Sequence, residues 1–228
     1  MDLERIIAHK RHLWAMPSWC PAPRIERARP ARPGRFTAAV SGREVGIVAS
    51  VLPRSWRAAV AYEAGGAAAV SAPADELLAG GGPDIVGLVA GAVDVPVLFS
   101  DVVVDSRQLD MAYACGADAV RIVVRALDDA ELADLAAIAD GLGLDALHSA
   151  ADAADVERAL DVGAAVVGLG EPVGLEIPVP AVLEGGSWDR AGIERVAESG
   201  FTGCVVDAGL LDGADPAAAV RRLTGVAV

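Results

Sequence analysis

Few side chains in this sequence combine chemical reactivity with a place at or near the end of an apolar run. Glu184 and Asp207 each end such a run, and Arg121 lies inside another. A carboxylate among apolar neighbours can act as a general acid or base, and a guanidinium can bind a carboxylate through two parallel hydrogen bonds. We therefore predict Glu184 and Asp207 as catalytic residues and Arg121 as a group that binds a substrate carboxylate.

Small hydroxyls and apolar side chains occupy the comparable positions of other runs. We predict that they contact the substrate, and the set comprises Ser50, Ser71, Ser100, Ser149, Leu98 and Val123. Successive strand residues point to opposite faces, so His148 points away from Ser149. A serine–histidine hydrolytic pair is therefore not expected.

Two interpretations of Arg121 remain open, because an unpaired charge inside a protein is costly. The guanidinium either binds a substrate carboxylate or pairs internally with Glu184 or Asp207. Glu184 is correspondingly either an acid–base group or only a counter-charge for Arg121.

The apolar runs recur behind Ala-rich helical stretches, and a glycine stands between helix and run at Gly66, Gly116, Gly163 and Gly200. A left-handed glycine commonly ends a helix in this way. Runs that are apolar on both faces are typical of parallel strands covered by helices. We predict strands near residues 45–50, 68–71, 97–100, 119–124, 146–149, 165–169, 181–184 and 204–207.

This alternation of helices and eight strands favours an α/β fold, a (β/α)8 TIM barrel, over a doubly wound sheet. The helices are expected near residues 3–15, 56–64, 84–92, 106–114, 128–141, 153–161, 189–198 and 216–223. Three prolines between residues 171 and 180 exclude a helix between strands six and seven. We predict one domain, residues 1–228, in which residues 1–35 form an N-terminal helix and a Pro/Arg-rich arm and residues 36–228 form the barrel.

Composition narrows the class of protein. The formal charge is −13, which disfavours non-specific binding to nucleic acid. No apolar run approaches the roughly 18 residues of a membrane span, and the charged N-terminus is not a secretory signal. We expect a cytoplasmic protein without a membrane or nucleic-acid partner. The cysteines and histidines show no metal-ligand spacing and no dinucleotide-binding motif is present, so we expect neither a metal nor a cofactor.

Several stretches resemble the indole-3-glycerol phosphate synthase family. They are Leu3–Arg11, Ala61–Ser71, Val95–Asp101, Asp145–Leu147 and Val156–Leu160. The resemblance implies a TIM barrel that closes and decarboxylates an anthranilate-derived, phosphorylated ribulose to form the indole ring. In the family, two lysines, three glutamates and an asparagine at the strand ends perform this reaction.

At most of those positions this sequence has other residues. The family's first-strand glutamate and lysine, third-strand lysine, fifth-strand glutamate and sixth-strand asparagine correspond to Ser50, Leu52, Ser100, Ser149 and Gly170. The seventh-strand glutamate remains as Glu184. The only lysine of the chain is Lys10, which precedes every expected strand.

These differences favour a repurposed barrel, a lyase, cyclase or isomerase of specialised metabolism with a divergent active site. Its substrate is expected to be a small aromatic or indole-like carboxylate without phosphate. One alternative is a non-catalytic pseudoenzyme that binds a metabolite or a partner protein, with a homodimer or protein partner on the strand 6–7 side. A second alternative is a true indole-3-glycerol phosphate synthase with relocated groups.

Overall fold

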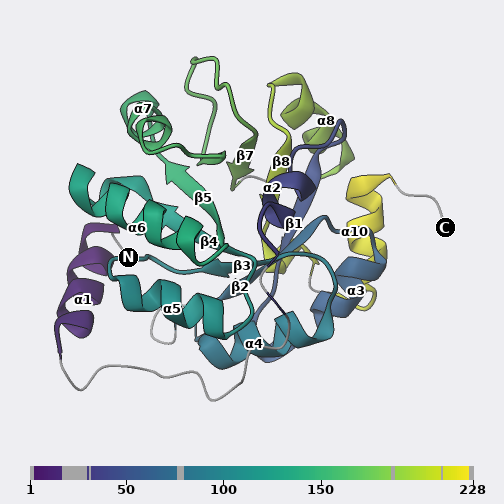
Figure 1. The fold of residues 1–228 in the computed structure, drawn as a ribbon. Helices are drawn as coiled ribbons and strands as arrows, with labels where there is room; N and C mark the ends of the chain where they lie inside the picture. Colours follow the sequence, from purple (N-terminus) through teal and green to yellow (C-terminus); the bar gives the residue numbers. More distant parts are fainter. Residues whose placement is uncertain are drawn as a thin grey trace.

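In a computed structural model of the protein, eight parallel strands close into a barrel with helices around it (Figure 1). The structure describes residues 3–16, 30, 32–75, 80–185, 188–211 and 213–225. Each strand pairs with its neighbours in sequence, and β8 pairs with β1 to close the barrel. The predicted TIM barrel is confirmed. Most of the Pro/Arg-rich arm lies outside the described residues.

The strands agree with the predicted ranges to within two residues. They are β1 Gly46–Ser50, β2 Ala69–Pro73, β3 Val97–Ser100, β4 Ala119–Val123, β5 Asp145–Ala150, β6 Val166–Leu169, β7 Ala181–Glu184 and β8 Gly203–Val206. Because β8 ends at Val206, Asp207 follows the strand rather than ending it.

The expected helices are also present. They are α1 Leu3–Ala15, α3 Ala58–Ala64, α4 Pro83–Ala92, α5 Ser106–Ala114, α6 Asp129–Gly141, α7 Ala153–Asp161, α8 Arg190–Glu198 and α10 Pro216–Thr224. Sequence reasoning missed α2 (Arg35–Ala39) and α9 (Ala208–Leu211), together with 3-10 turns at Pro53–Ser55 and Val124–Ala126. Elements of three to five residues are too short to show a helical period in the sequence.

The recurrent glycines have the predicted left-handed conformation. The φ angles of Gly66, Gly116, Gly163 and Gly200 are 90°, 85°, 80° and 83°. A residue with a Cβ is strained at such angles. Each glycine therefore ends its helix and turns the chain into the next strand.

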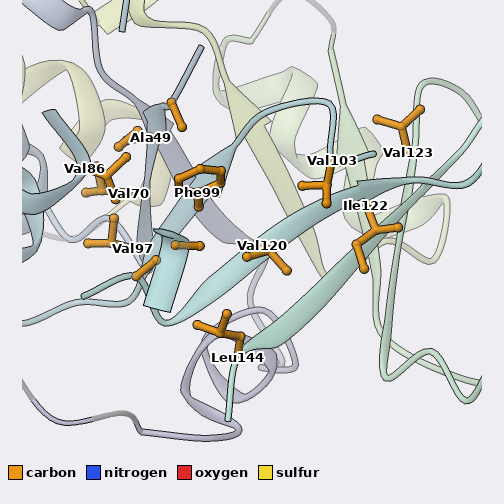
Figure 2. Close-up of a cluster of buried hydrophobic side chains, with 14 of the residues drawn as sticks. Ala49, Val70, Val86, Val97, Phe99, Val103, Val120, Ile122, Val123 and Leu144 are labelled. Atoms are coloured by element: carbon orange, nitrogen blue, oxygen red, sulfur yellow. The ribbon is translucent and has the colours of Figure 1, made fainter. Parts of the chain in front are cut away.

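The hydrophobic core has two layers. Strand residues such as Val70, Val97 and Val120 form one cluster with apolar residues of the surrounding helices, and Figure 2 shows part of this cluster. A second cluster fills the barrel itself, and Phe36 and Val40, at α2, belong to it with no exposed surface. Helix α2 thus plugs the amino-terminal end of the barrel, so the opposite end is left for a ligand.

No helix lies between β6 and β7, as predicted. The connection instead packs Val173, Ile177 and Val179 against the core, so it covers barrel wall that a helix would otherwise shield. The wall between β6 and β7 is therefore at least partly covered by the chain itself. Leu175 remains 41% exposed, and a partner on this side stays a prediction.

Within the described ranges, no helix has the length and apolar character needed to cross a bilayer.

Candidate functional site

Two cavities open at the carboxyl ends of the strands, where TIM-barrel enzymes place their active sites. The first chamber has a volume of about 270 Å³ and is lined by Ser50, Ser71, Leu98, Ser100, Arg121, Glu184, Gly185, Val205 and Asp207. The second chamber, of about 570 Å³, is lined by Leu3, Ile6, Val102, Arg121, Val123, Arg125, Ser149, Ala150, Ala151, Gly170, Glu171 and Glu184. All nine predicted site residues line one chamber or the other, and Arg121 and Glu184 line both.

Arg121 is the centre of the polar contacts in this mouth. Its Nη2 donates to Glu184 Oε2 at 3.2 Å, and its Nε and Nη2 donate to Ser149 Oγ at 3.3 and 3.2 Å. The Ser149 hydroxyl in turn donates a short hydrogen bond to Glu184 Oε2. Three strands, β4, β5 and β7, therefore bring a guanidinium, a hydroxyl and a carboxylate together.

These contacts show which internal partner Arg121 has. The Glu184 side chain is 13% exposed and the Arg121 side chain 36% exposed, so the pair is buried on the carboxylate side and open on the other. Asp207 is exposed at the rim and forms no ion pair with another described residue. Arg121 pairs with Glu184 and not with Asp207, and part of its guanidinium still faces the cavities.

Lys10 occupies a place that sequence reasoning did not foresee. Its ammonium lies 2.5 Å from Asp75 Oδ2 and 2.6 Å from Asp101 Oδ1, and all three side chains are less than 10% exposed. Asp75 follows β2 and Asp101 follows β3, so the only lysine reaches the carboxyl ends of these strands from α1. It does not line either chamber.

Burial dominates the chemistry of this triad. Burial raises the pKa of Asp101, and the attraction of Lys10 opposes that rise. Gln108 Nε2 donates to Asp101 Oδ2 at 2.9 Å. Asp101 thus binds Lys10 and Gln108 and does not line either chamber.

Further contacts anchor α1 to the barrel beside α5 and α6 (Figure 1). Arg107 donates to the Trp14 carbonyl and stacks over its ring, and Arg11 pairs with Glu131 at 2.6 Å. Leu3 and Ile6 at the start of the helix form a wall of the second chamber. One sequence signal existed, since Lys10 lies on the apolar stripe of the helix with Ile6 and Trp14.

The remaining reactive side chains lie away from the mouth. His148 is 3% exposed, and burial lowers its pKa to about 4, so its imidazole is neutral at pH 7. Burial raises the pKa of the Cys204 thiol to about 12. No group of three His, Cys, Asp or Glu within the described ranges is arranged to hold a metal ion.

Comparison with known proteins adds sequence relationships to this geometry. The profile of the indole-3-glycerol phosphate synthase family matches residues 50–171. An indole-3-glycerol phosphate synthase of a Nocardioides species is 36% identical over 193 residues, covering 78% of this chain and 74% of the relative. Indole-3-glycerol phosphate synthase 1 of Streptomyces coelicolor is 35% identical over 228 residues, covering 88% of this chain and 84% of the relative.

Solved structures share the fold at lower sequence identity. A 3-hexulose-6-phosphate synthase has a TM-score of 0.62 and 22% identity, covering 80% of this chain and 98% of that one. A thiamine phosphate pyrophosphorylase from Pyrococcus furiosus has a TM-score of 0.60 and 18% identity, covering 79% and 94%. At these identities the likeness concerns the barrel alone.

Proposed function

The chain belongs to the indole-3-glycerol phosphate synthase family, and from that premise we propose an enzyme that acts in its mouth on a small aromatic or indole-like carboxylate without phosphate. The reaction would be of the lyase, cyclase or isomerase class that fits the family. We place this activity in the cytoplasm and in specialised metabolism. The observation that carries the proposal is the half-open Arg121–Glu184 pair, which both chambers share.

Arg121 would bind the substrate by exchanging partners. Its side chain is 36% exposed and its contacts with Glu184 and Ser149 are 3.2–3.3 Å long, longer than usual for charge-assisted hydrogen bonds. An incoming carboxylate can offer two oxygens to the same fork. Glu184 would then be released from Arg121 beside the bound substrate, where it can give or take a proton.

The charge of the mouth argues against a phosphate group on the substrate. Barrel enzymes commonly bind phosphate at the loops after strands seven and eight. Here Glu184 ends β7 and Asp207 follows β8, so two carboxylates face one guanidinium in the first chamber. A phosphate dianion would meet a net negative site, whereas a ring with a single carboxylate and an amino group would suffer less repulsion.

The family's own reaction is the second candidate, and the comparisons support it more directly than they support a changed reaction. Both relatives described above are named for indole-3-glycerol phosphate synthase. The geometry of the mouth supports the family's reaction less well, because that reaction uses lysine ammonium groups in the mouth. Lys10 is held by Asp75 and Asp101 outside both chambers.

A thermal-shift experiment tests the proposal. Anthranilate and indole-3-carboxylate are added to the wild type, to Arg121→Ala and to Arg195→Ala, whose arginine is exposed on α8 and serves as a matched control. A ligand at 100 times its Kd stabilises the fold by about 2.7 kcal/mol. We expect a raised Tm in the wild type and in Arg195→Ala and no rise in Arg121→Ala. An equal rise in all three proteins would sink the assignment of Arg121.

The second candidate is tested with the family substrate, the phosphorylated, anthranilate-derived ribulose. Formation of indole glycerol phosphate by the wild type and its loss in Glu184→Gln would establish the family reaction and overturn the proposed change of substrate. If neither the carboxylates nor this substrate raises the Tm, the non-catalytic alternative takes precedence.

A further inference from the structure

Glu184 reaches its partner Ser149 by crossing a strand. Glu184 ends β7 and Ser149 lies on β5, so β6 stands between them. In the register of the sheet, Gly168 of β6 pairs with Ser149 on one side and with Val182 on the other. Val166 points into the barrel, and Gly168, two residues on, faces the same side. The Glu184 side chain therefore passes over Gly168.

The space above Gly168 is filled by the glutamate itself. A Cβ added at Gly168 would lie 2.8 Å from Glu184 Cδ, 2.9 Å from Oε1 and 3.2 Å from Cγ. Carbon atoms in good contact are about 3.5–4.0 Å apart, so these atoms cannot all stay in place. The crowded atoms belong to the end of a flexible side chain. A methyl group at position 168 would thus move the carboxylate rather than open the barrel.

We propose that Gly168 is a positioning residue: by having no side chain, it lets Glu184 lie across β6 against Ser149 and Arg121. Any residue with a Cβ at this position moves the carboxylate off both partners. The catalytic consequence rests on the proposed function, because the carboxylate so held is the acid–base group proposed above. The steric relation between Gly168 and Glu184 stands independently of it.

Gly203 provides a contrast inside the same barrel. A Cβ there would meet Val182 Cγ2 and Val40 Cβ, each at 3.2 Å, and the Gly46 carbonyl oxygen at 3.3 Å. These neighbours belong to the packed amino-terminal end and do not include Glu184. Gly203→Ala is therefore a matched glycine-to-alanine change whose cost does not depend on the glutamate.

A double-mutant cycle separates positioning from ordinary packing. Gly168→Ala is made in the wild type and in Glu184→Ala, and the Tm of all four proteins is measured without ligand. We expect Gly168→Ala to lower the Tm by about 2–4 °C in the wild type, the shift that about 1 kcal/mol produces in a chain of this size. In Glu184→Ala the same change should have no effect or raise the Tm. The lower backbone entropy of alanine in the unfolded chain acts in both backgrounds and cancels.

Gly203→Ala is expected to lower the Tm equally in both backgrounds. Equal Tm changes for Gly168→Ala in the two backgrounds would overturn the proposal. Gly168 would then affect the packing of β6 and not the position of Glu184. If Gly168→Ala does not fold alone but folds together with Glu184→Ala, the proposal is supported. Failure to fold in both backgrounds would overturn it. The double-mutant cycle uses no ligand, so its result does not depend on the proposed function. If no carboxylate probe raises the Tm of the wild type, the proposed function is wrong, but the result on Gly168 remains valid.

Discussion

At the scale of single residues, the mouth is governed by one guanidinium shared among groups from three strands. Arg121 contacts Glu184 and Ser149, and these two contact each other. A partly buried carboxylate needs such partners, because desolvation is only repaid by hydrogen bonds and an opposite charge. The same contacts form without a substrate. The contribution of the Arg121–Glu184 pair to the free energy of unfolding can therefore be measured separately from activity.

Removing both members of the Arg121–Glu184 pair should destabilise the fold by less than the two single losses added together. We expect Arg121→Ala to lower the free energy of unfolding by about 1–2 kcal/mol, less than for a fully buried pair because Arg121 is 36% exposed. In Arg121→Ala/Glu184→Gln, the loss should be smaller than the sum of the single losses by about 0.5–1 kcal/mol. Urea unfolding at pH 7 measures all four proteins. Strict additivity would contradict the coupling.

The exposed pair of Arg190 and Glu194 on α8 is the control for that cycle. Their side chains are 52% and 61% exposed. Exposed ion pairs contribute little, so their coupling energy should lie near zero.

At the scale of elements, α1 is the helix whose attachment shapes the second chamber. Its Lys10 closes a buried triad with Asp75 and Asp101, while Leu3 and Ile6 form part of the chamber wall. The second chamber is therefore complete only when α1 is packed against the barrel. Arg11 adds a second, exposed attachment to Glu131 of α6.

The triad should make the role of Lys10 depend on pH. Lys10→Met leaves two buried carboxylates without their cation and should cost about 3 kcal/mol at pH 7. Burial already raises the pKa of Asp101 and Lys10 opposes that rise, so its loss raises this pKa further. The folded variant then takes up a proton at higher pH than the unfolded chain, and protonation relieves the buried charge. The deficit should therefore shrink as the pH falls from 7 to 5, measured by urea unfolding.

Arg11→Met on the same helix is the matched control with a different pH response. Arg11 lowers the pKa of Glu131 to about 2. A lowered carboxyl pKa gives stability that is present above the ordinary value of the group and is lost only as the pH falls toward 2. The deficit of Arg11→Met should stay unchanged between pH 7 and 5. Parallel behaviour of the two variants would argue against a charged buried triad.

At the scale of the whole molecule, the barrel divides into a stabilising end and a functional end. Phe36 and Val40 fill the amino-terminal end without exposed surface, whereas all the predicted site residues lie at the opposite end. Such a division is general in TIM barrels, because the loops that follow the strands can vary while the core is kept.

Phe36→Ala tests this division. Loss of a buried phenylalanine should lower the free energy of unfolding by about 3–5 kcal/mol, through lost burial and the cavity that remains. Guanidinium unfolding measures that loss. The Tm increase given by a carboxylate that binds the wild type should persist in the variant. If that increase disappears, the two ends are coupled and the division fails.

Much of the architecture could be predicted from local patterns. Glycines after Ala-rich stretches predicted the helix ends, and strand alternation predicted which side chains line the mouth. The prolines between residues 171 and 180 predicted a connection without a helix. Helix α2 was not predicted, because five residues are too few to show a helical period. It nevertheless closes one end of the barrel through Phe36.

The alternation of strands and helices, the absence of one helix and the residue types at the mouth follow from the order of the amino acids, because they depend on neighbours a few positions apart. Three contacts could be learned only from the folded chain: Arg121 pairs with Glu184 rather than Asp207, Lys10 lies between Asp75 and Asp101, and Glu184 lies over Gly168. Arg121 and Glu184 are 63 residues apart in the chain. Closure of the barrel brings such groups to hydrogen-bonding distance, and no local pattern encodes which of two carboxylates a guanidinium will meet.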